Sequence, residues 1–220
     1  RYGLTGDPVA AETSAVAALL EQVRDTQVPV HLMQVSTARS LELIATAKAA
    51  GLPITASTTW MHLLHSTRSL QTYDPSLRLD PPLGNPEDQT ALVEAVQAGV
   101  IDAIAINHRA YTYEEKTVGF ATAPAGAIGL PLALPLLWHH HAKVAPLPWL
   151  RALSTAPAQI FGQMPPSLAV GEPAEMTLFD PAQPWVAHSQ SLKTPAQNTP
   201  WYGLEIQGQV IKTWQAPMAQ

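Results

Sequence analysis

The sequence predicts an α/β fold in which parallel strands alternate with crossover helices. Helical patterns of apolar residues alternate along the first half of the chain with short apolar runs, at roughly 25- to 45-residue spacing, as in strand–helix units. With 220 residues, 46% of them hydrophobic, the chain is long enough to bury a sizeable core. Its charged fraction of 13% lies well below the usual value of about a quarter, which favours a globular chain.

The N-terminal elements are expected to be a helix, a strand, a second helix and a second strand. Apolar residues recur at helical spacing from Ala10 to Arg24, and the run from Val28 to Val35 is typical of a short buried strand. Residues 36–37, a Ser-Thr pair, can cap the second helix, which is expected to stop at Gly51 because glycine easily adopts a left-handed C-cap. Residues 52–56 are predicted as the second strand.

A third helix and strand follow a loop. Asn85 is a good N-cap and Pro86 suits the first helical position, so a helix is predicted to begin there and to end at Gly99. The apolar run from Ile101 to Ile106 is predicted as the third strand.

The composition changes beyond about Ser167, where Pro, Gln and Thr become frequent. Short β-rich runs are expected to form edge strands of a small β domain at residues 176–179, 185–187, 202–206 and 210–214. We therefore predict two domains, with residues 1–167 forming the α/β portion and residues 168–220 the β portion.

Charge and composition argue against several classes of partner. A net charge of −5 gives no basic footprint for nucleic acid or an anionic membrane. The longest apolar stretch, Ala125 to Trp138, is interrupted by prolines and glycines and is too short to span a bilayer. The absence of cysteine excludes disulfides and fits a reducing compartment, so a cytoplasmic protein is expected. Because the chain begins at Arg1 without Met, a fragment or processed product is also expected.

Segments along the whole chain resemble, in the same order, those of type I dihydroorotases, the zinc amidohydrolases of pyrimidine synthesis. Residues 30–37 resemble the family's segment ending in His-Val-Ser-Thr, and residues 52–64 resemble its Leu-Pro-Val-Thr strand with the following Pro-His-His-Leu turn. Residues 79–83 resemble its Asn-Pro-Pro-Leu loop, and residues 101–108 resemble its Asp-Val-Ile-Ala-Thr-Asp-His strand. The later matches are residues 114–116, 125–130, 134–137, 157–158, 160–162, 178–180 and 198–200, with Gly203 and Gly208. Their shared order carries the resemblance, since each segment alone is weak.

The resemblance implies the second half of an amidohydrolase-type (β/α)8 barrel followed by the C-terminal part of a small β-sandwich. In such barrels the chemistry lies at the C-terminal ends of strands, here expected at Gln34, Ser57 and Asn107. Family members bind two metal ions mainly through ligands of the first half of the barrel, and those motifs have no counterpart in these 220 residues.

The family's functional positions in this half are altered. Gln34 stands where the family has a metal-binding His, and Asn107 where it has the Asp that acts as ligand and base. Neutral amide oxygens are weak zinc ligands and cannot accept a proton from bound water. At the substrate positions, Asp80 replaces an Asn and would repel a carboxylate, Tyr111 replaces a His, and Ala125 with Gly126 loosely fits the pattern.

Three functions are weighed on this basis. The first is a catalytically inactive dihydroorotase homologue without a cofactor that forms a homo-oligomer or a complex with aspartate carbamoyltransferase, a partner implied by the resemblance. The second is an active zinc-dependent dihydroorotase whose other half completes the site. The third is a module that binds another small ligand without metal. A half barrel would leave apolar sheet edges open, which also predicts a covering segment or partner.

Other conspicuous side chains have plainer interpretations. His31, in an apolar strand, is expected to be a core histidine, and His108 either contacts the pocket or is structural. Residues 139–141, three consecutive histidines, are expected on the surface because they point in different directions on a helix. The tryptophans are expected to anchor packing, although Trp201 and Trp214 could mark a contact surface.

Overall fold

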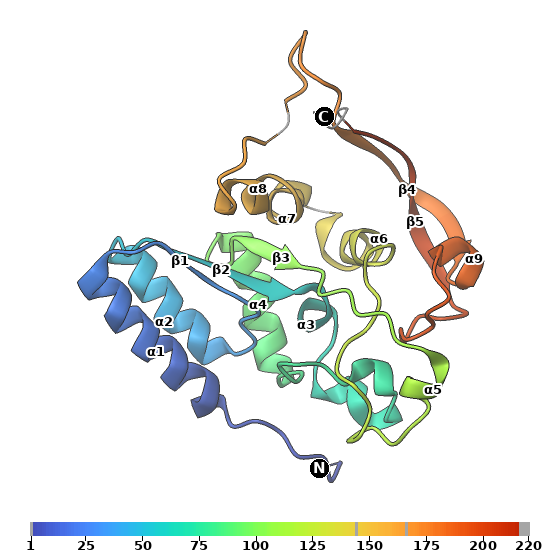
Figure 1. The fold of residues 1–220 in the computed structure, drawn as a ribbon, viewed down its shortest axis with the longest axis horizontal. Coiled ribbons are helices and arrows are strands. Elements are labelled where there is room, and N and C mark those ends of the chain that lie inside the picture. The colour runs from blue at the N-terminus through green and yellow to red at the C-terminus, as the bar shows by residue number, and fades with distance from the viewer. Residues whose placement is uncertain (1, 144, 166, 216–220) are drawn as a thin grey trace.

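A sheet of three parallel strands forms the centre of the computed structural model, which describes residues 2–143, 145–165 and 167–215. Its strands lie in chain order: β1 (Val30–Leu32), β2 (Ile54–Thr59) and β3 (Ala103–Ala105). The long helices α1 (Val9–Thr26), α2 (Ala38–Ala49) and α4 (Pro86–Ala98) pack beside one another and against this sheet, as Figure 1 shows.

Local capping signals set the helix ends that the sequence predicts. The side chain of Thr37 accepts a hydrogen bond from the backbone N–H of Ser40 at the start of α2. At the start of α4, Asn85 and Asp88 form a reciprocal capping box, which satisfies two backbone donors that the helix cannot pair. The helix ends at Gly99, whose φ of 74° is a left-handed C-cap. These predicted boundaries are confirmed.

The remaining elements are short and join the strands to the C-terminal region. They are α3 (Trp60–Leu64), 3-10 turns at Thr67–Thr72 and Pro75–Leu77, α5 (Tyr113–Lys116), α6 (Ala133–Leu137) with a π-helical turn at Trp138–Ala142, α7 (Pro146–Leu153), α8 (Thr155–Ile160) and α9 (Ser189–Leu192). Helix α7 packs on β3 and α4, next to the third strand.

The two faces of the sheet differ in character. Ala56 and Thr58 on β2 are fully buried, and Ala56 belongs to a hydrophobic core that includes Ile44 of α2. The other face of the sheet carries Thr55 and Ser57 of β2, whose hydroxyl oxygens lie 2.8 Å and 3.0 Å from the two ring nitrogens of His31 on β1. Burial lowers the pKa of this half-buried histidine, which favours its neutral form. His31 is therefore satisfied by hydroxyl groups, as expected of a structural histidine.

The C-terminal region contains an antiparallel ribbon of β4 (Met176–Val186) and β5 (Glu205–Trp214), which extends away from the parallel sheet in Figure 1. The four short runs expected here merge into two long strands, and residues 202–204 precede β5. A register shift between Asp180 and Pro184 absorbs the intervening residues, so β4 continues past them. The domain boundary at residues 167/168 stays a prediction.

Candidate functional site

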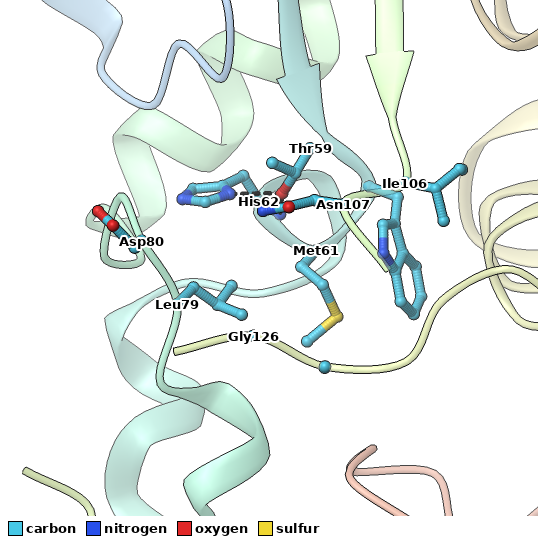
Figure 2. Close-up of a pocket in the computed structure, with 10 residues that line it drawn as sticks. Thr59, Met61, His62, Leu79, Asp80, Ile106, Asn107 and Gly126 are labelled. Carbon is cyan, nitrogen blue, oxygen red and sulfur yellow. Dashed lines mark hydrogen bonds between the residues drawn. The ribbon is translucent and has the colours of Figure 1, made fainter. Parts of the chain in front are cut away.

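A small pocket lies where β2 and β3 end. Figure 2 shows it between the end of β2, the end of β3 and two further loops. Its lining residues are Thr59, Trp60, Met61, His62, Leu79, Asp80, Ile106, Asn107, Gly126 and Ala127. The volume of this pocket is about 10 Å³, enough for one water molecule, so the described residues around it do not form a substrate-sized cavity at these strand ends.

The structure corrects one predicted strand end. β2 was expected to end near Ser57, but it continues to Thr59 because it pairs with β3 from Ser57 opposite Ala103 to Thr59 opposite Ala105. Thr59 is therefore the residue of β2 that reaches the pocket.

Three of the predicted site residues meet in this pocket, although they come from separate loops. Asp80, Asn107 and Gly126 all line it. Tyr111 and Ala125 lie beside it and are joined by a hydrogen bond in which the Tyr111 hydroxyl donates to the Ala125 carbonyl at 3.0 Å. Gln34, the remaining predicted residue, follows β1 and does not line the pocket.

Gln34 and Asn107 share an unusual backbone conformation. Their φ angles are 59° and 45°, in the left-handed region, which costs about 1 kcal/mol for a residue with a Cβ and is tolerated best by asparagine. In both places the chain turns sharply just after a strand. Beyond Gln34, the backbone N–H of Val35 donates to the carbonyl of Ser57 at 2.8 Å, which holds the turn against β2.

Glu12 of α1 fixes the loop that follows Gln34. Its carboxylate accepts hydrogen bonds from both the backbone N–H and the hydroxyl of Ser36 and Thr37, all within 3.2 Å. This contact was not predicted, since Glu12 is 24 residues from Ser36 and no local pattern marks it. The loop geometry at β1 thus depends on a carboxylate of the first helix.

His62 lines the pocket but has no nitrogen lone pair free for a ligand. Its Nε2 lies 3.2 Å from the Pro82 carbonyl, which can only accept, so Nε2 carries the proton. Its Nδ1 then accepts a hydrogen bond of 2.6 Å from the Thr59 hydroxyl, drawn in Figure 2. Burial lowers the pKa of His62, so the neutral ring joins the end of β2 to the loop that carries Asp80.

His108 and Lys116 hold neighbouring loops. His108 Nδ1 accepts hydrogen bonds from the backbone N–H groups of Gly129 and Leu130 at 3.0 and 3.2 Å, which favours its structural interpretation. Lys116, a residue that sequence reasoning missed, donates through Nζ to the carbonyls of Pro75 and Pro124 at 2.9 and 2.7 Å. Burial lowers the Lys116 pKa to about 8.

The run of three histidines is only partly at the surface. His139 and His140 are exposed as expected. The expectation is wrong for His141, which is half-buried, donates through Nε2 to the Leu63 carbonyl at 3.0 Å and stacks on Trp149 with 5.0 Å between ring centroids.

The side chains of the described residues do not fit a zinc site. Within residues 2–143, 145–165 and 167–215, no group of three or more His, Cys, Asp or Glu side chains is arranged to hold a metal ion. The positions where the resemblance implies ligands carry the amides Gln34 and Asn107, which are weak donors for zinc. In the same described part of the chain, no helix has the length and apolar character needed to cross a membrane.

Sequence comparison finds relatives that this chain matches nearly from end to end. A probable dihydroorotase-like protein of Synechocystis is 44% identical over 98% of this chain and 50% of its own length. Dihydroorotases of Deinococcus radiodurans and Mycobacterium leprae are 35% and 36% identical over 94% and 97% of this chain, again about half of their length. No family model matches the chain.

Structural comparison supports the fold. The L-hydantoinase (dihydropyrimidinase) of Arthrobacter aurescens has a TM-score of 0.85 at 22% identity, covering 97% of this chain and 50% of its own. The dihydropyrimidinase of Brevibacillus agri has a TM-score of 0.82 at 21% identity, covering 94% and 48%. These matches confirm the partial amidohydrolase barrel and carry no further weight at such identity. The chain therefore belongs to the dihydroorotase family and corresponds to the C-terminal half of a dihydroorotase-type protein.

Proposed function

We propose that this chain belongs to a cytoplasmic, dihydroorotase-like protein of pyrimidine biosynthesis that is catalytically inactive and serves as a structural partner of aspartate carbamoyltransferase. The observation that carries the proposal is the pair Gln34 and Asn107 at positions where the resemblance implies a metal-binding His and an Asp base. The relative with 44% identity, named dihydroorotase-like, also supports a divergent branch of the family.

The chemistry of the pocket supports inactivity. Hydrolysis of a cyclic amide at a zinc site needs a metal-bound water and a group that accepts its proton, and ring closure, the reverse reaction, needs the same group to return a proton to the departing water. Asn107 lines the pocket but its amide cannot accept a proton, and both ring nitrogens of His62 are already hydrogen-bonded. The exposed carboxylate of Asp80 adds negative charge where the substrate would bring carboxylates of its own.

Open apolar surface supports a role in assembly. A groove of about 1490 Å³ lies between α4, α7, α8 and the β4–β5 ribbon. Leu147, Leu150 and Trp214 line it and are 78%, 39% and 36% exposed. Surface of this kind is normally covered by further protein. The other half of a family member supplies one cover, and a second copy or aspartate carbamoyltransferase supplies another.

The second candidate is an active zinc-dependent dihydroorotase converting N-carbamoyl-aspartate to dihydroorotate. Its support is positional, since Asp80, Asn107 and Gly126 still converge at the strand ends. The chain spans about half the length of its curated relatives, and under this candidate the other half would bring most of the metal ligands.

The test uses the full-length protein that carries this chain, purified without chelator. Metal content is measured by mass spectrometry, dihydroorotate formation is assayed in parallel, and association with the carbamoyltransferase of the same organism is followed by size-exclusion chromatography with light scattering. We expect no bound zinc, no turnover and co-elution. Near-stoichiometric zinc with turnover would establish the second candidate, and separate elution of the two proteins would refute the partnership.

A further inference from the structure

We propose that the turn Asn198–Trp201 positions two walls of the pocket, through hydrogen bonds at its first residue and aromatic stacking at its last. The turn lies in the C-terminal region, far along the chain from the strands that form the pocket. The inference concerns the geometry of the pocket and does not require the proposed function.

Asn198 is buried, with 4% of the residue exposed, and its side chain joins two loops beside the pocket. Its Nδ2 donates to the carbonyl of Arg109 at 2.8 Å and to that of Gly126 at 3.3 Å, while its Oδ1 accepts from the backbone N–H of Tyr111 at 3.2 Å. Its own carbonyl accepts from the N–H of Ile128 at 3.1 Å. One amide therefore fixes the separation of residues 109–111 and 126–128.

The wall that Asn198 holds has little room to move. Gly126 lines the pocket with a φ of 123°, and its backbone N–H donates to the Arg78 carbonyl at 2.8 Å. A Cβ at this position would lie 2.7 Å from Cδ of Arg109, so the arginine stem packs directly on the glycine. Because both the N–H and the carbonyl of Gly126 are bonded, its place in the wall depends on Asn198 and Arg78.

Trp201 supports a second part of the pocket wall, at Trp60. Its ring stacks on Trp60 with 5.3 Å between centroids and contacts His65 at 4.9 Å. Trp60 lines the pocket and is 1% exposed, so its position follows that of the ring packed against it. Both ends of the turn thus reach residues that line the pocket.

The turn is itself anchored to the ribbon. The N–H of Gly203 donates to the Ala187 carbonyl at 2.7 Å, and the N–H of Ala187 donates to the Leu204 carbonyl at 3.0 Å. These bonds lie at the end of β4 and the start of β5. A displacement of the ribbon would therefore be passed through this turn to both pocket walls.

Residue-resolved amide hydrogen exchange on the full-length protein tests the role of Asn198. Asn198→Leu keeps the side-chain shape and removes its polar atoms, so exchange at Tyr111 should rise about tenfold, while Ile128, bonded to a backbone carbonyl, changes much less. Asn198→Asp keeps the acceptor for Tyr111 but loses the donor to the carbonyls of Arg109 and Gly126. The wall at Gly126 should then loosen, so exchange of the Gly126 N–H, which is bonded to the Arg78 carbonyl, should rise while Tyr111 is spared.

The matched control is Asn85→Leu, which removes the α4 cap and destabilises the fold without touching the pocket. If Asn198→Leu raises exchange uniformly, as this control does, or leaves Tyr111 unchanged, Asn198 is not a positioning residue. For the other wall, Trp201→Ala should shift the indole N–H resonance of Trp60 and Trp201→Phe should largely preserve it. An unchanged Trp60 resonance in Trp201→Ala would overturn that part. None of these outcomes depends on carbamoyltransferase binding.

Discussion

Acidification should destabilise this protein through His65, which follows α3 and is packed under Trp201. Its Nδ1 lies 3.0 Å from the Ser69 hydroxyl, and its buried Nε2 has no hydrogen-bond partner among the described residues. Burial, with a smaller contribution from His140, lowers the pKa of His65 from 6.5 to about 4. A charged ring at this position would be desolvated and unpaired.

The direction and the size of this pH effect on stability follow from the lowered pKa of His65. Because the folded pKa lies below the unfolded one, the unfolded state binds more protons between pH 6.5 and 4. The stabilisation is therefore complete above pH 6.5 and is lost as pH falls toward 4. Lowering the His65 pKa from 6.5 to about 4 corresponds to about 3 kcal/mol in the free energy of unfolding.

Urea unfolding of the wild type and of His65→Phe, measured from pH 7 to pH 4, isolates this contribution. Phenylalanine keeps a ring against Trp201 but cannot titrate, and its loss of the Ser69 hydrogen bond is the same at every pH. The difference in unfolding free energy between the two proteins should change by about 3 kcal/mol in favour of the variant as pH falls. Parallel stability curves, or an imidazole NMR titration near 6.5, would refute the reasoning.

Three further predictions concern the loops and the altered ligand positions. Glu12→Gln should lower the free energy of unfolding by roughly 2 kcal/mol in urea titrations, because a neutral amide replaces a carboxylate that accepts four hydrogen bonds; equal midpoints would contradict it. In thermal unfolding, Gly126→Ala should lower the free energy of unfolding by about 2 kcal/mol and Gly51→Ala by only about 1 kcal/mol. Both glycines have a positive φ, but only at Gly126 would the added Cβ contact another side chain, that of Arg109. The double variant Gln34→His with Asn107→Asp, made in the full-length protein, should raise zinc affinity by at least about tenfold in equilibrium dialysis, and an unchanged affinity would count against these positions as ligand positions.

Local sequence determined the helix boundaries and the chemistry of individual strand ends. The caps at Asn85 and Gly99 were predictable because they depend on residues within one turn of the helix. The parallel sheet followed from the alternation of strand and helix patterns, and the amides at Gln34 and Asn107 were visible directly in the motifs that resemble the family.

Only the tertiary structure decided which side chains hold the site together. Glu12 reaches Ser36 across 24 residues and Asn198 reaches Arg109 across 89, distances over which periodicity and capping patterns carry no information. The same holds for the end of β2, which its pairing with β3 extends to Thr59. Helical and strand patterns report backbone hydrogen bonding and burial within a few residues, whereas the pocket is assembled from loops that meet only after the chain has folded.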